Sequence, residues 1–163
     1  MRILLILRGN YFNGQKLFLA ENNLTPHTLD LEELRFLAGG YKVLSNGYKS
    51  LDYRNASSIL KTLFDFLELR MNKGEFCVVN APNANNSLLK EYKTLADKYR
   101  YELFIVDFNS LNLEECKEKN LALAHQTGIF IPEHILEAID YSLEKEKISK
   151  KYTVLKPNEW KSC

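Results

Sequence analysis

The sequence predicts an α/β fold, a three-layer α/β/α sandwich with a parallel sheet in the middle. Continuous apolar segments such as residues 3–7 are typical of parallel strands that are buried on both faces. Longer segments with the 3.6-residue apolar period of helices alternate with them. The chain has 163 residues, of which 45% are hydrophobic and 26% charged, as expected for one folded domain.

The expected elements follow one another in a regular order. Strands are expected at residues 3–7, 27–29, 76–79 and 101–106. Helices are expected at residues 15–22, 31–37, 56–71, 87–99, 113–119 and 132–145. Loops are expected at residues 9–14, 82–86 and 120–131, and residues 41–54 are expected to be irregular. A sheet of four or five parallel strands with right-handed crossovers follows from this order.

Local signals set the ends of these elements. Gly9 ends the first strand, and Pro26 stops the helix that follows it. Asn46-Gly47 marks a turn within the irregular segment. The helix at 56–71 is amphipathic, and Pro132 opens the last helix at its first turn.

Charge divides the chain into two predicted parts, a domain at residues 1–146 and a basic C-terminal tail at 147–163. The whole chain has a net charge of +1, so nothing attracts it as a whole to nucleic acid or membrane. From Lys145 onward, however, six lysines face only two glutamates. We interpret this segment as a solvated tail, with a nucleic-acid contact as the alternative. Trp160 in it either anchors the tail on the core or binds a partner.

The environment expected from the sequence is the cytoplasm. Cys77, Cys116 and Cys163 are scattered and odd in number, which fits a reducing compartment rather than a disulfide framework. The apolar start lacks a cleavage site and is interpreted as a buried strand, and no segment reaches the ~18 apolar residues of a membrane span. His27, His125 and His134 lack the spacing of zinc ligands, so no metal site is expected.

The first loop has the spacing of a phosphate-binding loop. Gly9 to Gly14, called the glycine loop below, separates an apolar strand from a helix, as GxxxxG does before Lys and Ser/Thr. Here Gln15 stands at the lysine position and Lys16 at the hydroxyl position. The candidate phosphate-binding residues are Gly9, Asn13, Gly14, Gln15 and Lys16. An ordinary strand–turn–helix is the alternative.

Several ordered segments together resemble a known family. These are the two loop glycines, residues 28–35 (TLDLEELR), residues 76–83 (FCVVNAPN) and residues 119–132. From about residue 1 to 145 the chain resembles the 5′-kinase domain of phage-type polynucleotide kinases, in the P-loop kinase superfamily. The resemblance implies a P-loop NTPase or kinase-like fold, ATP with Mg²⁺ as cofactors, and a nucleotide or nucleic acid as partner.

The resemblance also implies site residues. It places Glu32 at the family's general base, with Asp30 as the alternative, and Arg35 at its catalytic arginine. The aspartate that the family has near Ala81 is missing, and residues 117–134, which look like the lid, contain no arginine. On the residues alone, Glu32, Glu33 and Arg35 also fit an exposed helix face, and Asp30 also fits a helix N-cap.

Residues 41–54 mix aromatic and basic side chains. Lys42, Tyr48, Lys49 and Arg54 are candidates for holding nucleic acid, because aromatic rings stack on bases and cations hold phosphates. A packed surface loop is the alternative.

Three functions follow. The first is a pseudokinase that binds nucleotide or nucleic acid, or regulates, with little phosphoryl transfer. The second is an active divergent kinase that uses Lys16 or Arg8 for the phosphates and Glu32 or Asp30 as base. The third is a protein-interaction subunit with an empty cleft.

Overall fold

Five parallel strands form the central sheet of the computed structural model, which describes residues 1–161. The predicted tail ends at Cys163, which lies outside the described residues. The strands are β1 (Ile3–Arg8), β2 (Thr28–Asp30), β5 (Cys77–Asn80), β6 (Glu102–Asp107) and β7 (Thr153–Leu155). Their order across the sheet is β2-β5-β1-β6-β7, so β1 lies in the middle.

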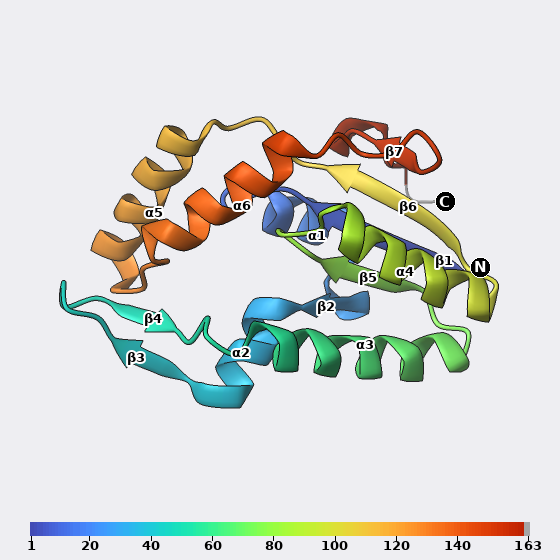
Figure 1. Ribbon diagram of the computed structural model, residues 1–163, viewed down its shortest axis with the longest axis horizontal. Coiled ribbons are helices and arrows are strands. Elements are labelled where there is room, and N and C mark those ends of the chain that lie inside the picture. The colour runs from blue at the N-terminus through green and yellow to red at the C-terminus, as the bar shows by residue number, and fades with distance from the viewer. Residues whose placement is uncertain (162–163) are drawn as a thin grey trace.

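Helices cover both faces of the sheet. They are α1 (Gln15–Glu21), α2 (Leu31–Gly39), α3 (Ala56–Asn72), α4 (Asn86–Tyr99), α5 (Leu113–Thr127) and α6 (Glu133–Lys145). Figure 1 shows α3 and α4 in front of the sheet and α1 behind it. In the same view, α5 and α6 extend beyond the carboxyl end of β1.

The alternation of side chains along β1 builds the two core layers. Leu4 and Ile6 belong to the cluster that contains α3 and α4 residues, such as Leu63. Leu5 and Leu7 belong to the cluster that contains Phe18 of α1. Because successive side chains of a strand point to opposite faces, one wholly apolar strand serves both clusters. The three-layer α/β prediction is therefore confirmed.

The segment at 41–54 is a hairpin, so the prediction that it is irregular was wrong. β3 (Tyr41–Val43) and β4 (Lys49–Leu51) pair antiparallel, with Tyr41 opposite Leu51. The turn expected at Asn46-Gly47 is present, and Gly47 has a φ of 85°. The strands have only three residues each, too short for their alternation to be recognised in the sequence.

The loop predicted from residue 120 also differs, because α5 continues to Thr127 and ends where Gly128 is left-handed, with a φ of 74°. Asn120 is fully buried within this helix. Its amide donates to the carbonyl of Ile131 and accepts from the Ile131 N–H, at 2.7 and 2.9 Å. A polar residue thus lies on the buried face of α5, and it interrupts the apolar period by which the sequence would reveal the helix.

Part of the predicted solvated tail joins the sheet. β7 pairs in parallel with β6, with Val154 opposite Ile105. Trp160 packs on the core, with its ring 6.4 Å from that of Phe76 and 6.5 Å from that of Phe104. The interpretation of this whole segment as a solvated tail is therefore wrong. Its lysines hid a short strand and an aromatic anchor. Within residues 1–161, no helix has both the length and the apolar character needed to cross a membrane.

Candidate functional site

The glycine loop joins β1 to α1 at the carboxyl end of the sheet. Gly9 has a φ of 147° and Gly14 a φ of 94°, both in the region that favours glycine. A side chain at Gly9 would place Cβ 2.0 Å from the carbonyl oxygen of Phe108. Gly9 is therefore required for the close approach of two chain segments, whereas nothing lies near a Cβ built on Gly14.

The side chain of Gln15 occupies the inside of the glycine loop. Its Nε2 donates to the carbonyls of Gly9 and Asn10, at 3.0 and 2.9 Å. Its Oε1 accepts from the N–H of Asn13 at 3.1 Å. Gln15 is only 6% exposed. An uncharged amide therefore cross-links the backbone of the loop, and it takes up the N–H of Asn13.

Side chains of asparagine hold the rest of the loop. The N–H of Tyr11 donates to Oδ1 of Asn10. Nδ2 of Asn13 donates to the carbonyl of Asn10, and Oδ1 of Asn13 accepts from the N–H of Leu111. The predicted phosphate ligand Asn13 thus fixes the loop to the segment before α5. Lys16 is exposed and forms no ion pair with any described residue.

Glu32 accepts hydrogen bonds from two tyrosines. Tyr11 Oη lies 2.5 Å from Oε1 of Glu32, and Tyr53 Oη lies 2.8 Å from Oε2. Burial raises the pKa of Glu32, although the two hydroxyls act in the opposite direction. Burial also raises the pKa values of Tyr11 and Tyr53, with the charge of Glu32 next in effect. The hydroxyls therefore remain donors, and both oxygens of the carboxylate are in use.

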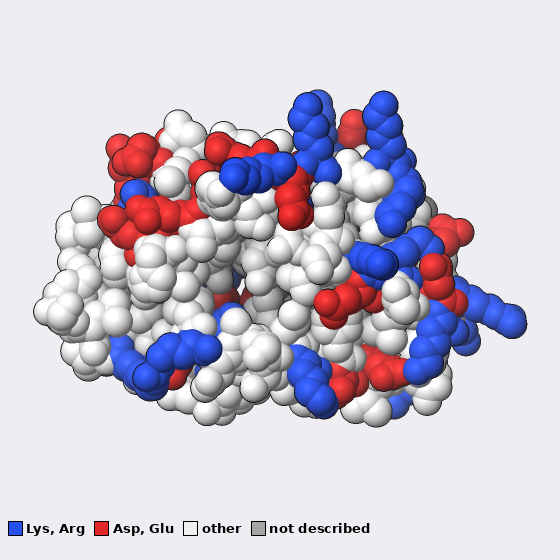
Figure 2. Space-filling view, in the orientation of Figure 1, with Lys and Arg blue, Asp and Glu red and all other residues white. Residues whose placement is uncertain are grey.

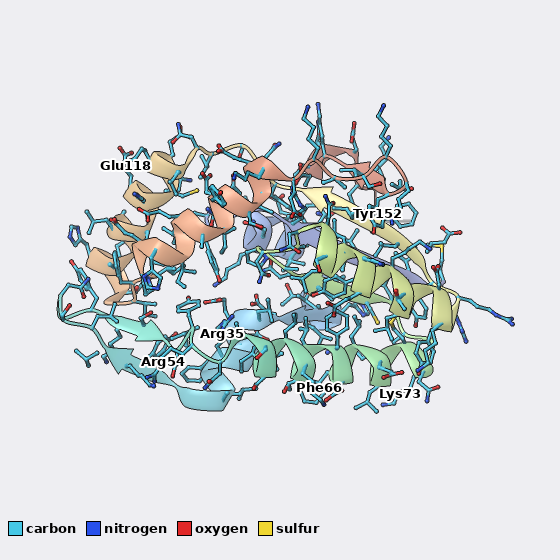
Figure 3. The ribbon with its side chains drawn as sticks, in the orientation of Figure 1. Arg35, Arg54, Phe66, Lys73, Glu118 and Tyr152 are labelled. Atoms are coloured by element: carbon cyan, nitrogen blue, oxygen red, sulfur yellow. The ribbon has the colours of Figure 1, made fainter. Side chains whose placement is uncertain are left out.

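Arg35 is buried under this cluster, at 7% exposure, so its interpretation as part of an exposed helix face was wrong. Its guanidinium lies 4.9 Å from the centre of the Tyr53 ring, and its Nε lies 3.9 Å from Glu32. Figure 3 marks Arg35 on α2. Arg35 does not line the cavity described below.

Asp30 caps α2, as the alternative interpretation predicted. Its Oδ1 accepts from the N–H of Glu32 at 2.8 Å, and its Oδ2 accepts from Nδ2 of Asn80 at 3.1 Å. β2 and β5 are neighbours and place Asp30 directly opposite Asn80 in the register. Adjacent strands that end at the same edge thus bring residues 50 positions apart into contact.

These residues surround a cavity of about 920 Å³ between the glycine loop, α2, the hairpin and the end of α5. Glu32, Asp30, Asn80, Tyr11 and Tyr53 line it, and so do Gln15 and Lys16. Figure 2 shows a hollow near the centre of this face, and few charged side chains where α5 meets the hairpin.

The hairpin and the segment after α5 meet across the cavity. The N–H of Lys49 donates to the carbonyl of Gly128 at 2.7 Å, and the N–H of Phe130 donates to the carbonyl of Lys49 at 2.8 Å. The rings of Tyr48 and Phe130 are stacked, with centres 5.7 Å apart. This contact, called the clasp below, links the two segments that border the cavity.

None of the four predicted nucleic-acid residues lines the cavity. Lys42 and Arg54 both form ion pairs with Asp52, at 2.6 and 2.8 Å, and hold the pKa of that carboxyl well below its usual range. Tyr48 and Lys49 belong to the clasp. Figure 3 marks Arg54 beside the hairpin, in the segment between β4 and α3.

Arg8, the other predicted phosphate cation, faces a second cavity of about 600 Å³. It is buried and donates to Asp107 at 3.0 Å, and its Nε donates to the carbonyl of Ala84. Across residues 1–161, no group of three or more histidine, cysteine, aspartate or glutamate side chains has a metal-binding arrangement.

Comparison with solved structures identifies the fold. The Pnkp1/Rnl/Hen1 RNA repair complex contains a chain that is 19% identical, with a TM-score of 0.66 over 88% of this chain and 44% of that one. A putative kinase from Chloroflexus aurantiacus is 11% identical, with a TM-score of 0.68 over 95% and 86% of the two chains. A sugar kinase from Janibacter sp. is 12% identical, with a TM-score of 0.62 over 97% and 87%.

The chain has a P-loop kinase-like fold. At these identities the likeness concerns the fold alone, and the chain spans less than half the length of its match in the RNA repair complex. No protein-family model matches it, and neither does any curated protein.

Sequence reasoning missed Tyr11, Tyr53 and Asn80 as residues of the cavity. Tyr11 was covered only as a position within the glycine loop, and Asn80 only as a position within residues 76–83. Recognition of the hairpin would have separated its aromatic residues from its cations. Tyr41 and Lys42 are neighbours on one strand, so their side chains face opposite sides. Tyr41 and Tyr53 of the segment line the cavity, whereas Lys42, Lys49 and Arg54 do not.

Proposed function

We propose that this chain is a degenerate P-loop kinase-like protein that binds a nucleotide or a nucleic acid and catalyses little phosphoryl transfer. The observation that carries the proposal is the Gln15 amide inside the glycine loop. It stands at the lysine position of the motif and donates to two loop carbonyls, but it brings no charge. Phosphoryl transfer depends on such charges, because catalysis there is mainly positioning and electrostatic stabilisation.

The segment expected to form the lid supports the same proposal. Residues 117–134 contain no arginine. Lys117 lies within 4 Å of three glutamates, at 3.7, 3.9 and 2.8 Å, so its charge is already neutralised. An arginine that stabilises the transition state is worth about 10³–10⁵ in rate. Its absence raises the barrier by roughly 4–7 kcal/mol.

The proposed base is also occupied. Both oxygens of Glu32 accept tyrosine hydroxyls, so an acceptor hydroxyl would have to displace Tyr11 or Tyr53 before Glu32 took its proton. The proposed nucleotide is ATP with Mg²⁺. A nucleic acid would extend over the hairpin, where Lys42, Lys49 and Arg54 supply cations and Tyr48 an aromatic ring.

Thermal denaturation with millimolar ATP, with and without Mg²⁺, tests the binding part. A ligand at 100 times its Kd stabilises the folded state by about 2.7 kcal/mol. We expect ATP to raise the unfolding temperature of the wild type. It should raise that of Gln15→Lys by more, because this variant adds the missing charge. Gln15→Leu removes the loop bonds without adding charge and is the matched control. No shift in either the wild type or Gln15→Lys would contradict nucleotide binding and favour a protein-interaction subunit.

Phosphorylation of a 5′-hydroxyl oligonucleotide tests the catalytic part. We expect no product above background from the wild type. Readily measured product that disappears in Lys16→Ala and in Glu32→Ala or Asp30→Ala would instead establish an active divergent kinase. Arg35→Ala and Arg8→Ala complete this series, because Arg35 packs against Tyr53 and Glu32 and Arg8 lines the second cavity.

A further inference from the structure

Asn80, which lines the cavity, has an unused hydrogen-bond acceptor, whereas its own donor and those of Tyr11 and Tyr53 are in use. The hydroxyls of Tyr11 and Tyr53 donate to Glu32, and Nδ2 of Asn80 donates to Asp30. Oδ1 of Asn80 is buried and has no hydrogen-bond partner among the described residues. Asn80 is itself only 7% exposed and lines the cavity. Because buried acceptors are normally satisfied, a ligand that fills this site is expected to bring the donor.

The walls of the cavity present aromatic rings. Phe36 of α2 and Tyr41 of β3 are 49% and 43% exposed, and their ring centres lie 5.2 Å apart. Phe130 lines the cavity from the clasp. Exposed aromatic faces of this kind stack on planar rings, and every nucleobase offers such a face. The cations that line the cavity, Lys16 and Lys119, are both exposed and therefore lie at its rim.

We propose that the cavity binds a planar aromatic ring that carries an amino group, the chemistry of adenine and cytosine. The ring stacks on the aromatic walls, and the amino group donates to Oδ1 of Asn80. This inference rests on the proposed function, because it takes the same cavity as the ligand site. It adds a specificity, since a ring without an amino group leaves the buried acceptor unpaired.

Calorimetric titration of the full chain with adenosine and with purine riboside tests the specificity, because the two nucleosides differ only in the amino group. We expect adenosine to bind at least about tenfold more tightly. Asn80→Leu should abolish the preference. Asn83→Leu is the matched control and should retain it, because Oδ1 of Asn83 is also buried and unpartnered but does not line the cavity. Equal affinities for the two nucleosides, or no adenosine binding at millimolar concentration, would overturn the proposal.

A second pair of variants tests the aromatic wall. Tyr41→Leu should weaken adenosine binding about tenfold, since stacking on an aromatic side chain contributes strongly to base binding. Tyr141→Leu changes an exposed tyrosine on α6 outside the cavity and should have no effect. Unchanged affinity of Tyr41→Leu would contradict the stacking.

The amino-bearing ring can belong to a free nucleoside or to the end of a nucleic-acid strand. Titration with the dinucleotide ApA separates these sources. Tighter binding of ApA than of adenosine assigns the site to a strand end, and equal or weaker binding assigns it to a free nucleoside. Neither probe needs the glycine loop to bind a terminal phosphate. Stabilisation by ATP without any preference for adenosine would therefore refute this inference and leave the proposed function standing.

Discussion

At the scale of single residues, the glycine loop is held by uncharged groups. Gln15, Asn10 and Asn13 satisfy the backbone of the loop with their amides. The N–H groups of Tyr11 and Asn13 and the carbonyls of Gly9 and Asn10 therefore have partners within the loop and α1. Gln15, whose lack of charge carries the proposed loss of phosphoryl transfer, thus also stabilises the fold of the loop.

The two loop glycines should respond differently to substitution. Gly9→Ala should lower the free energy of unfolding by about 3 kcal/mol or more, because Cβ would lie 2.0 Å from the Phe108 carbonyl oxygen. Gly14→Ala should cost roughly 1–2 kcal/mol, since only its positive φ is unfavourable. Urea denaturation of both variants measures the difference. Equal losses would show that the approach of the two chain segments does not decide the choice of glycine at position 9.

Glu32 should make stability depend on pH. Its pKa is raised by burial, so the folded state binds more protons than the unfolded chain. Its contribution to stability is therefore fully present below the ordinary pKa of glutamate and is lost as the pH rises through the raised value. Relative to the wild type, Glu32→Gln should gain stability as the pH rises from about 4 to 7. Unfolding measured across this range checks the sign, with the exposed and uncharged Ser57→Ala as control.

At the scale of elements, the site depends on contacts between segments far apart in the sequence. α2 and the hairpin bring Glu32 and Tyr53 together, and the register of β2 with β5 joins Asp30 to Asn80. The clasp joins residue 49 to residues 128 and 130 through two backbone hydrogen bonds. Because the clasp has only these two backbone hydrogen bonds, it is expected to open more readily than the core strands.

Removing a hydrogen bond of the clasp should separate the hairpin from the segment after α5 without unfolding the domain. Lys49→Pro removes the N–H that donates to Gly128, whereas Lys49→Ala retains it. Hydrogen exchange should become faster at Phe130 and nearby amides in Lys49→Pro, with exchange in β1 unchanged. Lys49→Ala should exchange like the wild type. If both variants exchange alike, the backbone bonds do not hold the two segments together.

At the scale of the whole molecule, the C-terminal segment completes the sheet. β7 covers the edge of β6, and Trp160 packs against Phe76 and Phe104 over the face that α1 covers only in part. Tyr152 is buried on the opposite face. Both layers of the core therefore depend on residues beyond the predicted domain boundary at 146.

Truncation after Glu146 tests this dependence. Loss of β7, Tyr152 and Trp160 should lower the free energy of unfolding by roughly 3 kcal/mol or more, and the exposed edge of β6 should promote aggregation. The double variant Lys150→Ala, Lys151→Ala removes two charges but keeps the strand, so it should unfold like the wild type. Light scattering and urea denaturation give the two readouts. A truncated chain as stable as the full one would support 1–146 as a self-sufficient domain.

The sequence by itself determined the core of the fold and the position of the glycine loop. Continuous apolar strands such as β1 and amphipathic helices such as α3 have local patterns that express their burial directly. The three-residue strands of the hairpin and β7 have no such pattern, because their stability comes from pairing with distant segments.

Only the tertiary structure decided how the site is built. The lysine position holds Gln15 in the sequence, but the loop bonds of its amide depend on the folded path of Gly9 to Gly14. The contact of Tyr11 and Tyr53 with Glu32, and the unpaired acceptor of Asn80, depend on which chain segments meet at the carboxyl edge of the sheet. Local patterns report burial and backbone preference, whereas hydrogen bonds between distant side chains are fixed only when the strands and helices have packed.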